Sequence, residues 1–250
     1  MPSSTSAPAE TGAPMLTPLS ELPECVRSFE FLLRGRRATS GFRDDPVPRE
    51  VLDRALIFAS EAPSGFNFQP WRFLVLQSPE QRARLRAAAM DQAKITEAPV
   101  VVVAMADREA WRESAEEILR ARVEHTGVEA GDVEKQKRDA FAFIDRQSRE
   151  VWLTRQVMIA FSYLMLAVES LGWDTAPMEG FDPEAVRREL ELPDTVEIVA
   201  LLAIGRGSDP AQLHPGRLPV HRIAYDEHHG VAWHLPPRRA GNPAHPPGLS

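Results

Sequence analysis

The chain has 250 residues, of which 43% are hydrophobic and 26% charged, and its formal net charge is −7. This composition excludes an intrinsically disordered chain and predicts a globular protein that can bury a sizeable core. The acidic balance argues against nucleic acid as the main partner. The single cysteine, Cys25, excludes an internal disulfide and a cysteine-based zinc site, so we expect no metal and a reducing, cytoplasmic compartment.

The two ends of the chain are rich in proline and small residues. Residues 1–20 lack the basic and apolar regions of a signal peptide, and both this segment and residues 236–250 hold too little apolar surface to offset the entropy of ordering. We therefore predict a disordered N-terminal tail over 1–20, one folded domain over 21–235, and a proline-rich C-terminal tail over 236–250.

The first half of the domain alternates between helix-like and strand-like patterns. Apolar residues at helical spacing predict helices over 21–34 and 48–60, and an Arg- and Ala-rich stretch predicts a third over 79–90. Short apolar runs predict strands at 73–76 and 99–105. Because Cys25 lies on the apolar stripe of the first helix, we expect a buried thiol.

The second half is dominated by helix. Residues 108–147 are charged and helical in pattern, with weak points at Gly127 and Gly131. The most apolar segment, 157–168, is too short to span a bilayer and predicts a helix buried in a core or against a second subunit, with no membrane contact. Asp182-Pro183 begins a short helix, and 196–204 is the last strand. Interleaved helices and four or five strands indicate an α/β or α+β fold.

Polar residues stand out in two places. Asn67 and Gln69 place neutral amides among aromatic residues in the segment 62–71, where they could bind the edge of a planar heterocycle or hydrogen-bond their own loop. Arg36 and Arg37 follow the first helix, where they could compensate its dipole or hold a phosphate. The residues alone leave both pairs of alternatives open.

Four segments, taken together, resemble a known family. Residues 36–42 (RRATSGF) resemble the R-[RH]-S-x-[RK]-x-[FY] element that opens the FMN-dependent nitroreductases, and residues 63–73 (PSGFNFQPWRF) resemble their P-S-x-x-N-x-Q-P-W-x-F element. Residues 152–156 and 171–182 are similar to the family's W-x-x-x-Q and G-x-[DG]-[ST]-x-P-[IM]-E-G-F-D stretch, and residues 217–219 are similar to its closing R-x-P. The elements occur in family order.

The resemblance implies a fold and an activity. The fold would be an α+β sandwich, with a central, mainly antiparallel sheet flanked by helices, in a domain-intertwined homodimer with FMN at the subunit interface. The activity would be reduction of nitroaromatic or quinone-type acceptors by NADH or NADPH, in a ping-pong hydride transfer through flavin N5 without a catalytic side-chain acid or base. A reductive dehalogenase, a flavin-fragmenting enzyme and a flavin-binding protein without turnover remain alternatives.

The resemblance also assigns roles to residues. Arg36 and Arg217 would hold the FMN phosphate with Arg37 beside the cofactor, Lys94 would lie near the pyrimidine edge, and the backbone N–H groups of Glu179 and Gly180 would face N5. Residues of the partner subunit would complete each site. The expected cofactor-binding set is Arg36, Arg37, Ala38, Ser40, Pro63, Ser64, Asn67, Lys94, Pro177, Met178, Glu179, Gly180 and Arg217, with Pro63, Ser64 and Asn67 contributed by the partner. Phe141 and Phe143 are candidates for a substrate lid, or for ordinary packing.

Three positions depart from the family pattern. Ala38 replaces a serine, Ser40 a basic residue and Pro215 a lysine, so one hydroxyl donor and two positive charges are missing near the expected phosphate. Each lost charge-assisted hydrogen bond would weaken FMN binding by about tenfold or more. Arg43 and Arg72 are near enough in sequence to compensate.

Overall fold

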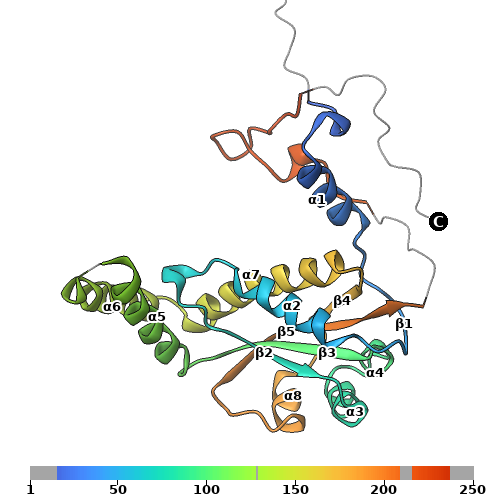
Figure 1. Ribbon diagram of the computed structural model, residues 1–250, viewed down its shortest axis with the longest axis horizontal. Coiled ribbons are helices and arrows are strands. Elements are labelled where there is room, and N and C mark those ends of the chain that lie inside the picture. The colour runs from blue at the N-terminus through green and yellow to red at the C-terminus, as the bar shows by residue number, and fades with distance from the viewer. Residues whose placement is uncertain (1–15, 128, 209–215, 237–250) are drawn as a thin grey trace, which may run out of the picture. The chain divides into compact units, whose positions relative to one another are not determined.

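The computed structural model describes residues 16–127, 129–208 and 216–236 (Figure 1). Most of the two expected tails, and Pro215, lie outside the described residues. Contacts divide the chain into two compact units. One unit runs from Arg36 to Gln212, and the other combines Met1–Gly35 with Leu213–Ser250.

The unit from Arg36 to Gln212 is built on a five-stranded sheet in which every strand pair is antiparallel. The strand order is β1-β5-β3-β2, and β4 also pairs with β5. The strands are β1 (Phe42–Arg43), β2 (Trp71–Leu76), β3 (Val100–Asp107), β4 (Asp174–Met178) and β5 (Val196–Gly207).

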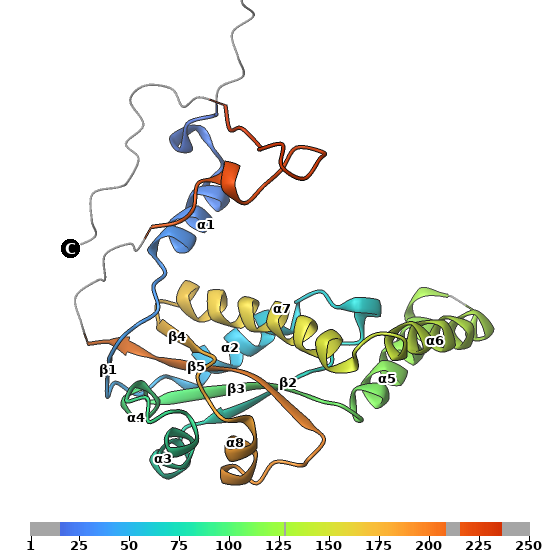
Figure 2. The same ribbon diagram turned by 180° about the vertical axis from the view of Figure 1, so that it is seen from behind.

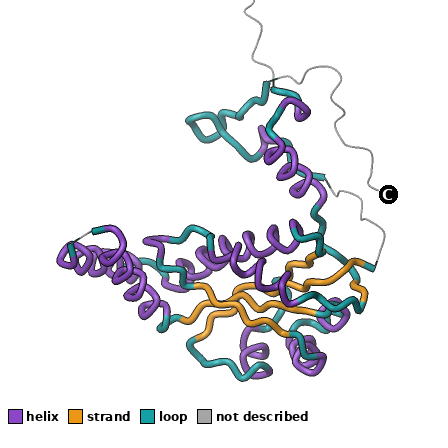
Figure 3. The backbone as a smooth tube through the Cα atoms, viewed as in Figure 1, coloured by secondary structure: helices purple, strands orange, loops and turns teal. Residues whose placement is uncertain are grey.

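Helices cover both faces of this sheet (Figures 1 and 2). The first face carries α2 (Arg49–Ser60) and α7 (Arg149–Ser170), and the second carries α3 (Pro79–Ala88), α4 (Lys94–Glu97) and α8 (Pro183–Glu189). A helical hairpin, α5 (Trp111–Thr126) and α6 (Ala130–Asp145), extends from one end of the sheet, as Figure 3 shows. The layers confirm the expected α+β sandwich.

The pattern of β3 explains why the sheet has two cores. Val100 and Val102 pack into the core beneath α7, whereas Val101 and Val103 pack into the core beneath α8. Successive side chains of a strand point to opposite faces, so a strand buried on both faces needs an unbroken apolar run. The valine run at 100–103 meets that requirement.

Helix α7 has 22 residues and is longer than the sequence predicted. It begins at Ser148, whose hydroxyl accepts the N–H of Val151 at 3.4 Å. By length and composition it could cross a membrane, but half of its most apolar window is buried inside the protein. It packs on β2, β3, β4, β5 and α2, which is the position of a core helix. Ile159 and Tyr163 remain exposed.

The strands β1 and β4 were not predicted. β1 has two residues, and β4 contains Pro177, which interrupts the usual strand signal. The break at Gly127 was predicted, and this residue ends α5 with a φ of 68°. Asp182 caps α8 as expected, with Oδ1 accepting the N–H groups of Glu184 and Ala185.

The other unit contains η1 (Leu19–Glu21), α1 (Glu24–Gly35) and η3 (Val220–Arg222). No residue of α1 is buried, and Phe29 and Phe31 are more than half exposed. Cys25 is exposed as well, so the prediction of a buried thiol was wrong. The apolar stripe is present in the sequence, but the other described residues of this unit do not bury it.

Candidate functional site

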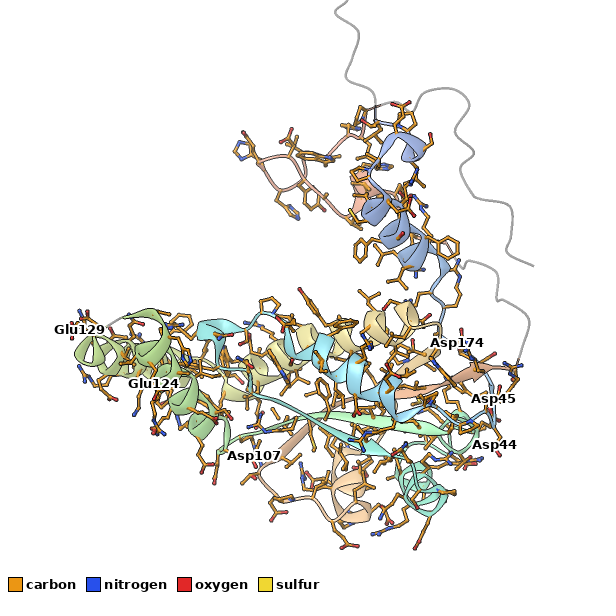
Figure 4. The ribbon with its side chains drawn as sticks, viewed as in Figure 1. Asp44, Asp45, Asp107, Glu124, Glu129 and Asp174 are labelled. Carbon is orange, nitrogen blue, oxygen red and sulfur yellow. The ribbon has the colours of Figure 1, made fainter. Side chains whose placement is uncertain are left out.

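The expected cofactor residues of the sheet unit lie in two groups: the segments 36–40 and 63–70 precede strands at opposite ends of the sheet, and Pro177 and Met178, which pair with Leu202 and Leu201, lie level with the middle of β5. Trp71, which follows the loop 63–70, pairs with Ala106, and Ala106 pairs with Glu197 of β5. Phe42, which follows the segment 36–40, pairs with Gly207 at the far end of β5. Ten residues of strand separate Glu197 from Gly207, or about 33 Å at ~3.3 Å per residue. In Figure 4 Asp107 marks the first end and Asp174 the second.

The segment Arg36–Ser40 forms the charged end. It is tied to β4, because Ala38 forms a parallel bridge with Thr175 and the N–H of Thr39 donates to the Thr175 carbonyl at 2.9 Å. Nη1 of Arg36 is buried and has no hydrogen-bond partner among the described residues. A buried guanidinium nitrogen without an acceptor is costly.

The turn after β4 brings together three of the expected residues. The Gly180 carbonyl accepts Nε2 of Gln92 at 2.7 Å, and Lys94 begins α4 two residues later. A Cβ at Gly180 would lie 3.4 Å from both Gln92 Nε2 and Met90 Sδ, so glycine suits this close approach. Glu179 and Gly180 directly follow Pro177 and Met178 of β4. Arg36–Ser40, the β4 residues, the turn and Lys94 therefore belong to one contiguous region.

The carboxyl group of Glu169 supports the charged end by binding Thr175 of β4. Oε1 of Glu169, near the end of α7, accepts the N–H of Thr175 at 3.0 Å and its hydroxyl at 2.5 Å. Burial raises the pKa of Glu169 to about 7, and Asp174 adds to the rise. The Thr175 hydrogen bonds and the Arg36 guanidinium act in the opposite direction.

The loop Pro63–Pro70 forms the other end and has an unusual backbone. Phe66 and Asn67 have positive φ values of 59° and 62°, which non-glycine residues rarely adopt. The Ser64 hydroxyl accepts the N–H of Gln69 at 3.0 Å. The Gln69 amide donates to Oδ1 of Asn67 at 3.3 Å, so the alternative in which these residues bond their own loop is realised for Gln69.

Helix α7 holds this loop in place. Oε1 of Gln156 accepts the N–H of Gly65 at 2.8 Å, and Gln156 is 8% exposed. A Cβ at Gly65 would lie 3.3 Å from Nε1 of Trp152, so any larger residue at that point would crowd the indole ring. Trp152 and Gln156 are the two named residues of the W-x-x-x-Q element, which explains their spacing: both face the loop from one side of the helix.

An aromatic cluster joins the loop to the hairpin α5–α6. Phe68 has no exposed surface and contacts Phe141 and Trp111, with ring centroids 5.8 and 6.1 Å apart. Phe141 thus packs in the protein, as the alternative to a lid role anticipated. Phe143 is 51% exposed and meets the ring of Phe66 edge-on at 6.0 Å. Of the two lid candidates, Phe143 is exposed and Phe141 is partly buried.

Of the other arginines considered for the site, Arg43 and Arg72 have partners of their own in the sheet unit. Arg217 belongs to the other unit and is exposed. Arg72 donates to the carbonyls of Gln69 and Trp71 and to the Ser114 hydroxyl, so it braces the loop end. Arg43 is at the charged end of the sheet but pairs with Asp45 at 3.1 Å.

Sequence reasoning missed the residues that position the others. No role was predicted for Gln92, Gln156 or Glu169, although each hydrogen-bonds a segment that carries predicted site residues. The sequence offered one indication for Glu169, because a carboxylate near the end of an apolar helix is costly to bury without a hydrogen-bond partner. For Gln92 the sequence held no such signal.

Comparisons with known proteins agree on one family. The profile described as "Nitroreductase family" matches residues 33–206. A Thermus thermophilus protein named NADH dehydrogenase is 40% identical over 192 residues, which cover 75% of this chain and 90% of that protein. A Nitroreductase Family Protein from Streptococcus pneumoniae superposes with a TM-score of 0.68 at 27% identity, over 79% of this chain and 99% of its own. A protein from Exiguobacterium sibiricum, solved in complex with FMN, superposes with a TM-score of 0.69 at 25% identity, over 85% of this chain and 98% of its own.

Proposed function

The chain belongs to the nitroreductase family and is an oxidoreductase, and on that premise we propose that it binds FMN and uses NADH or NADPH to reduce nitroaromatic or quinone-type acceptors. The observation that carries the proposal is that the motif residues form two groups. The chemistry of each group suits a different part of one ligand. One end offers cationic and backbone donors, and the other offers neutral amides and aromatic rings.

The charged end fits the phosphate-bearing part of FMN. The buried Nη1 of Arg36 lacks an acceptor among the described residues, and a phosphate oxygen would supply one. Arg36 and Arg217 would hold the phosphate, with Arg37 beside it. Lys94 would lie at the pyrimidine edge, and the N–H groups of Glu179 and Gly180 would face N5.

We propose that the protein is a homodimer, and the separation of the segment 36–40 from the loop 63–70 supports this arrangement. About 33 Å of strand lies between the levels of Trp71 and Phe42, which follow the segments 63–70 and 36–40. In the dimer that we propose, Pro63, Ser64 and Asn67 of the partner would therefore join Arg36 around one FMN. Apolar side chains on the α2 and α7 face support this arrangement, since Ile57, Phe58, Ile159 and Tyr163 are each at least 37% exposed. Exposed apolar groups on one face are typical of a surface that a second subunit covers.

The chain's own residues would bind and orient rather than exchange protons with the substrate. When bound, FMN would supply hydride transfer through N5, first from NAD(P)H and then to the acceptor, which makes the cycle ping-pong. Phe66 and Phe143 would limit the apolar side of the pocket and exclude water. We place this dimer in the cytoplasm, with small molecules as its only substrates and with neither nucleic acid nor membrane as a partner.

A flavin titration tests this function. The purified protein, mixed with FMN and filtered, is expected to retain a flavin absorbance band. Under anaerobic conditions NADH or NADPH should bleach that band, and a nitroaromatic or a quinone should restore it. Retained flavin that neither nucleotide bleaches would instead identify a binding protein without turnover. A protein that retains no FMN would overturn the assignment.

A further inference from the structure

Glu169 is linked to the expected phosphate segment by a chain of hydrogen bonds. Its Oε1 atom accepts both donors of Thr175, which has no exposed surface. The carbonyl of Thr175 then accepts the N–H of Thr39, and Ala38 bridges to the same residue. Through these contacts the end of α7 fixes where the segment Arg36–Ser40 lies on β4.

Glu169 also interacts electrostatically with Arg36, whose positive charge lowers the pKa of the carboxyl group. The interaction is mutual: an ionised Glu169 neutralises part of the charge that Arg36 offers to an anion, and a protonated Glu169 does not. The other charged group that acts on Glu169 is Asp174 of β4, which raises its pKa. The Asp174 carboxylate is itself engaged, since Oδ2 accepts the N–H of Gly207 at 2.7 Å.

The geometry allows both protonation states. Oε1 takes both hydrogen bonds from Thr175, so Oε2 can gain or lose a proton without breaking either of them. With a pKa of about 7, set mainly by burial, the group changes state near neutral pH. The hydrogen bonds from Thr175 can therefore persist whether or not Glu169 carries a charge.

We propose that Glu169 is a positioning residue for the FMN phosphate, and that binding of FMN is coupled to proton uptake from solvent at Oε2 of Glu169. This inference rests on the proposed function. A phosphate dianion at Arg36 disfavours a second negative charge beside the same guanidinium, so binding raises the pKa of the carboxyl group. By linkage, protonation of Glu169 strengthens FMN binding, and the contribution is lost as pH rises through 7.

The Glu169→Gln variant tests the coupling, because glutamine keeps an oxygen for the Thr175 donors and carries no charge. The dissociation constant of FMN is measured by flavin fluorescence from pH 6.5 to 8.5. The wild type is expected to lose up to about tenfold in affinity relative to the variant over this range, which corresponds to a binding-induced shift of about one pKa unit. The comparison with the variant cancels the ionisation of FMN's own phosphate.

A matched control lies on the same helix. Glu150, in the first turn of α7, is exposed, and Glu150→Gln makes the same change of charge about 28 Å away along the helix axis. Its pH profile should match that of the wild type. Riboflavin, which lacks the phosphate, should bind the wild type and Glu169→Gln with the same pH dependence.

A second measurement needs no variant. Calorimetric titration of the wild type with FMN near pH 7.5, in two buffers with different ionisation enthalpies, counts the protons exchanged on binding. Net uptake is expected. Zero uptake or net release, or parallel pH profiles for wild type and Glu169→Gln, would overturn the inference while leaving FMN binding intact. If the wild type binds no FMN at any pH, the proposed function itself fails.

Discussion

The two ends of the sheet differ in the hydrogen-bond donors that they leave without an acceptor. At the loop end the N–H groups of Gly65 and Gln69 have side-chain acceptors, and Phe68 is fully buried in contact with the rings of Phe141 and Trp111. The indole N–H of Trp111 is buried without an acceptor among the described residues. At the charged end Arg36 keeps a buried donor without an acceptor among the described residues. The two ends therefore differ in charge: the buried donor without an acceptor is a neutral indole N–H at the loop end, whereas at the charged end it belongs to a guanidinium.

This difference predicts that substitutions at the two ends affect different properties, namely the stability of the apoprotein and its affinity for FMN. A substitution at the loop end should lower the stability of the protein without cofactor, because it breaks an interaction that already exists. A substitution at the charged end should leave that stability unchanged and act on FMN affinity. Four substitutions test the distinction.

Arg36→Ala should have the largest effect. Removal of a phosphate contact worth ~1.5–3 kcal/mol predicts FMN binding weaker by about 10- to 150-fold. The melting temperature without FMN should stay the same or rise, because a buried donor without an acceptor is removed. Flavin titration and thermal unfolding check both. A large loss of apoprotein stability would show that Arg36 is a structural residue.

Gln156→Leu should affect stability first. The variant leaves the Gly65 N–H without its acceptor, which costs ~1–3 kcal/mol in the free energy of unfolding. Denaturant unfolding of the apoprotein measures the change. Gln136→Leu is the control, because Gln136 is exposed and its loss should cost less than about 0.5 kcal/mol. Equal stability of the two variants would contradict the role of α7 in holding the loop.

Arg217→Ala tests the contribution of the other unit. If its guanidinium reaches the phosphate, its loss should weaken FMN binding about tenfold. The side chain is exposed and donates to the carbonyl of the adjacent Gly216. The stability of the apoprotein should not change. Unaltered FMN affinity would remove Arg217 from the site.

Phe143→Ala should have the smallest effect. The ring is half exposed, so stability should change by less than about 1 kcal/mol, and FMN affinity should be unaltered. A lid role predicts a severalfold rise in KM for an aromatic acceptor. If KM is unchanged for a nitroaromatic and for a quinone alike, Phe143 takes no part in acceptor binding.

The sequence predicted the fold class and most elements because their signals are local. The valine run of β3, the Asp182-Pro183 start of α8 and the glycine break after α5 depend on neighbours along the chain. β4 escaped prediction because its pairing with β5 is set by distant residues and because it contains a proline. The burial of Cys25 was mispredicted because an apolar stripe indicates a contact without naming the partner.

The candidate site was predictable only as motifs. The resemblance selected Arg36, Asn67 and Gly180, but it gave no reason for their separation within one chain. That separation comes from the register of the sheet, which places the loop 63–70 and the segment 36–40 at opposite ends of β5. The supporting contacts of Gln156 and Glu169 are long-range and became visible only in three dimensions.

Mixed dimers test the central claim most directly. Arg36→Ala and Asn67→Ala chains, carrying different tags, are coexpressed, and the dimers that hold one of each are purified. If each site combines Arg36 of one chain with Asn67 of its partner, the mixed dimer has one intact site and one doubly altered site. It should therefore bind about one FMN tightly, while each homodimeric variant binds weakly at both sites. A mixed dimer with no tight site would contradict the account.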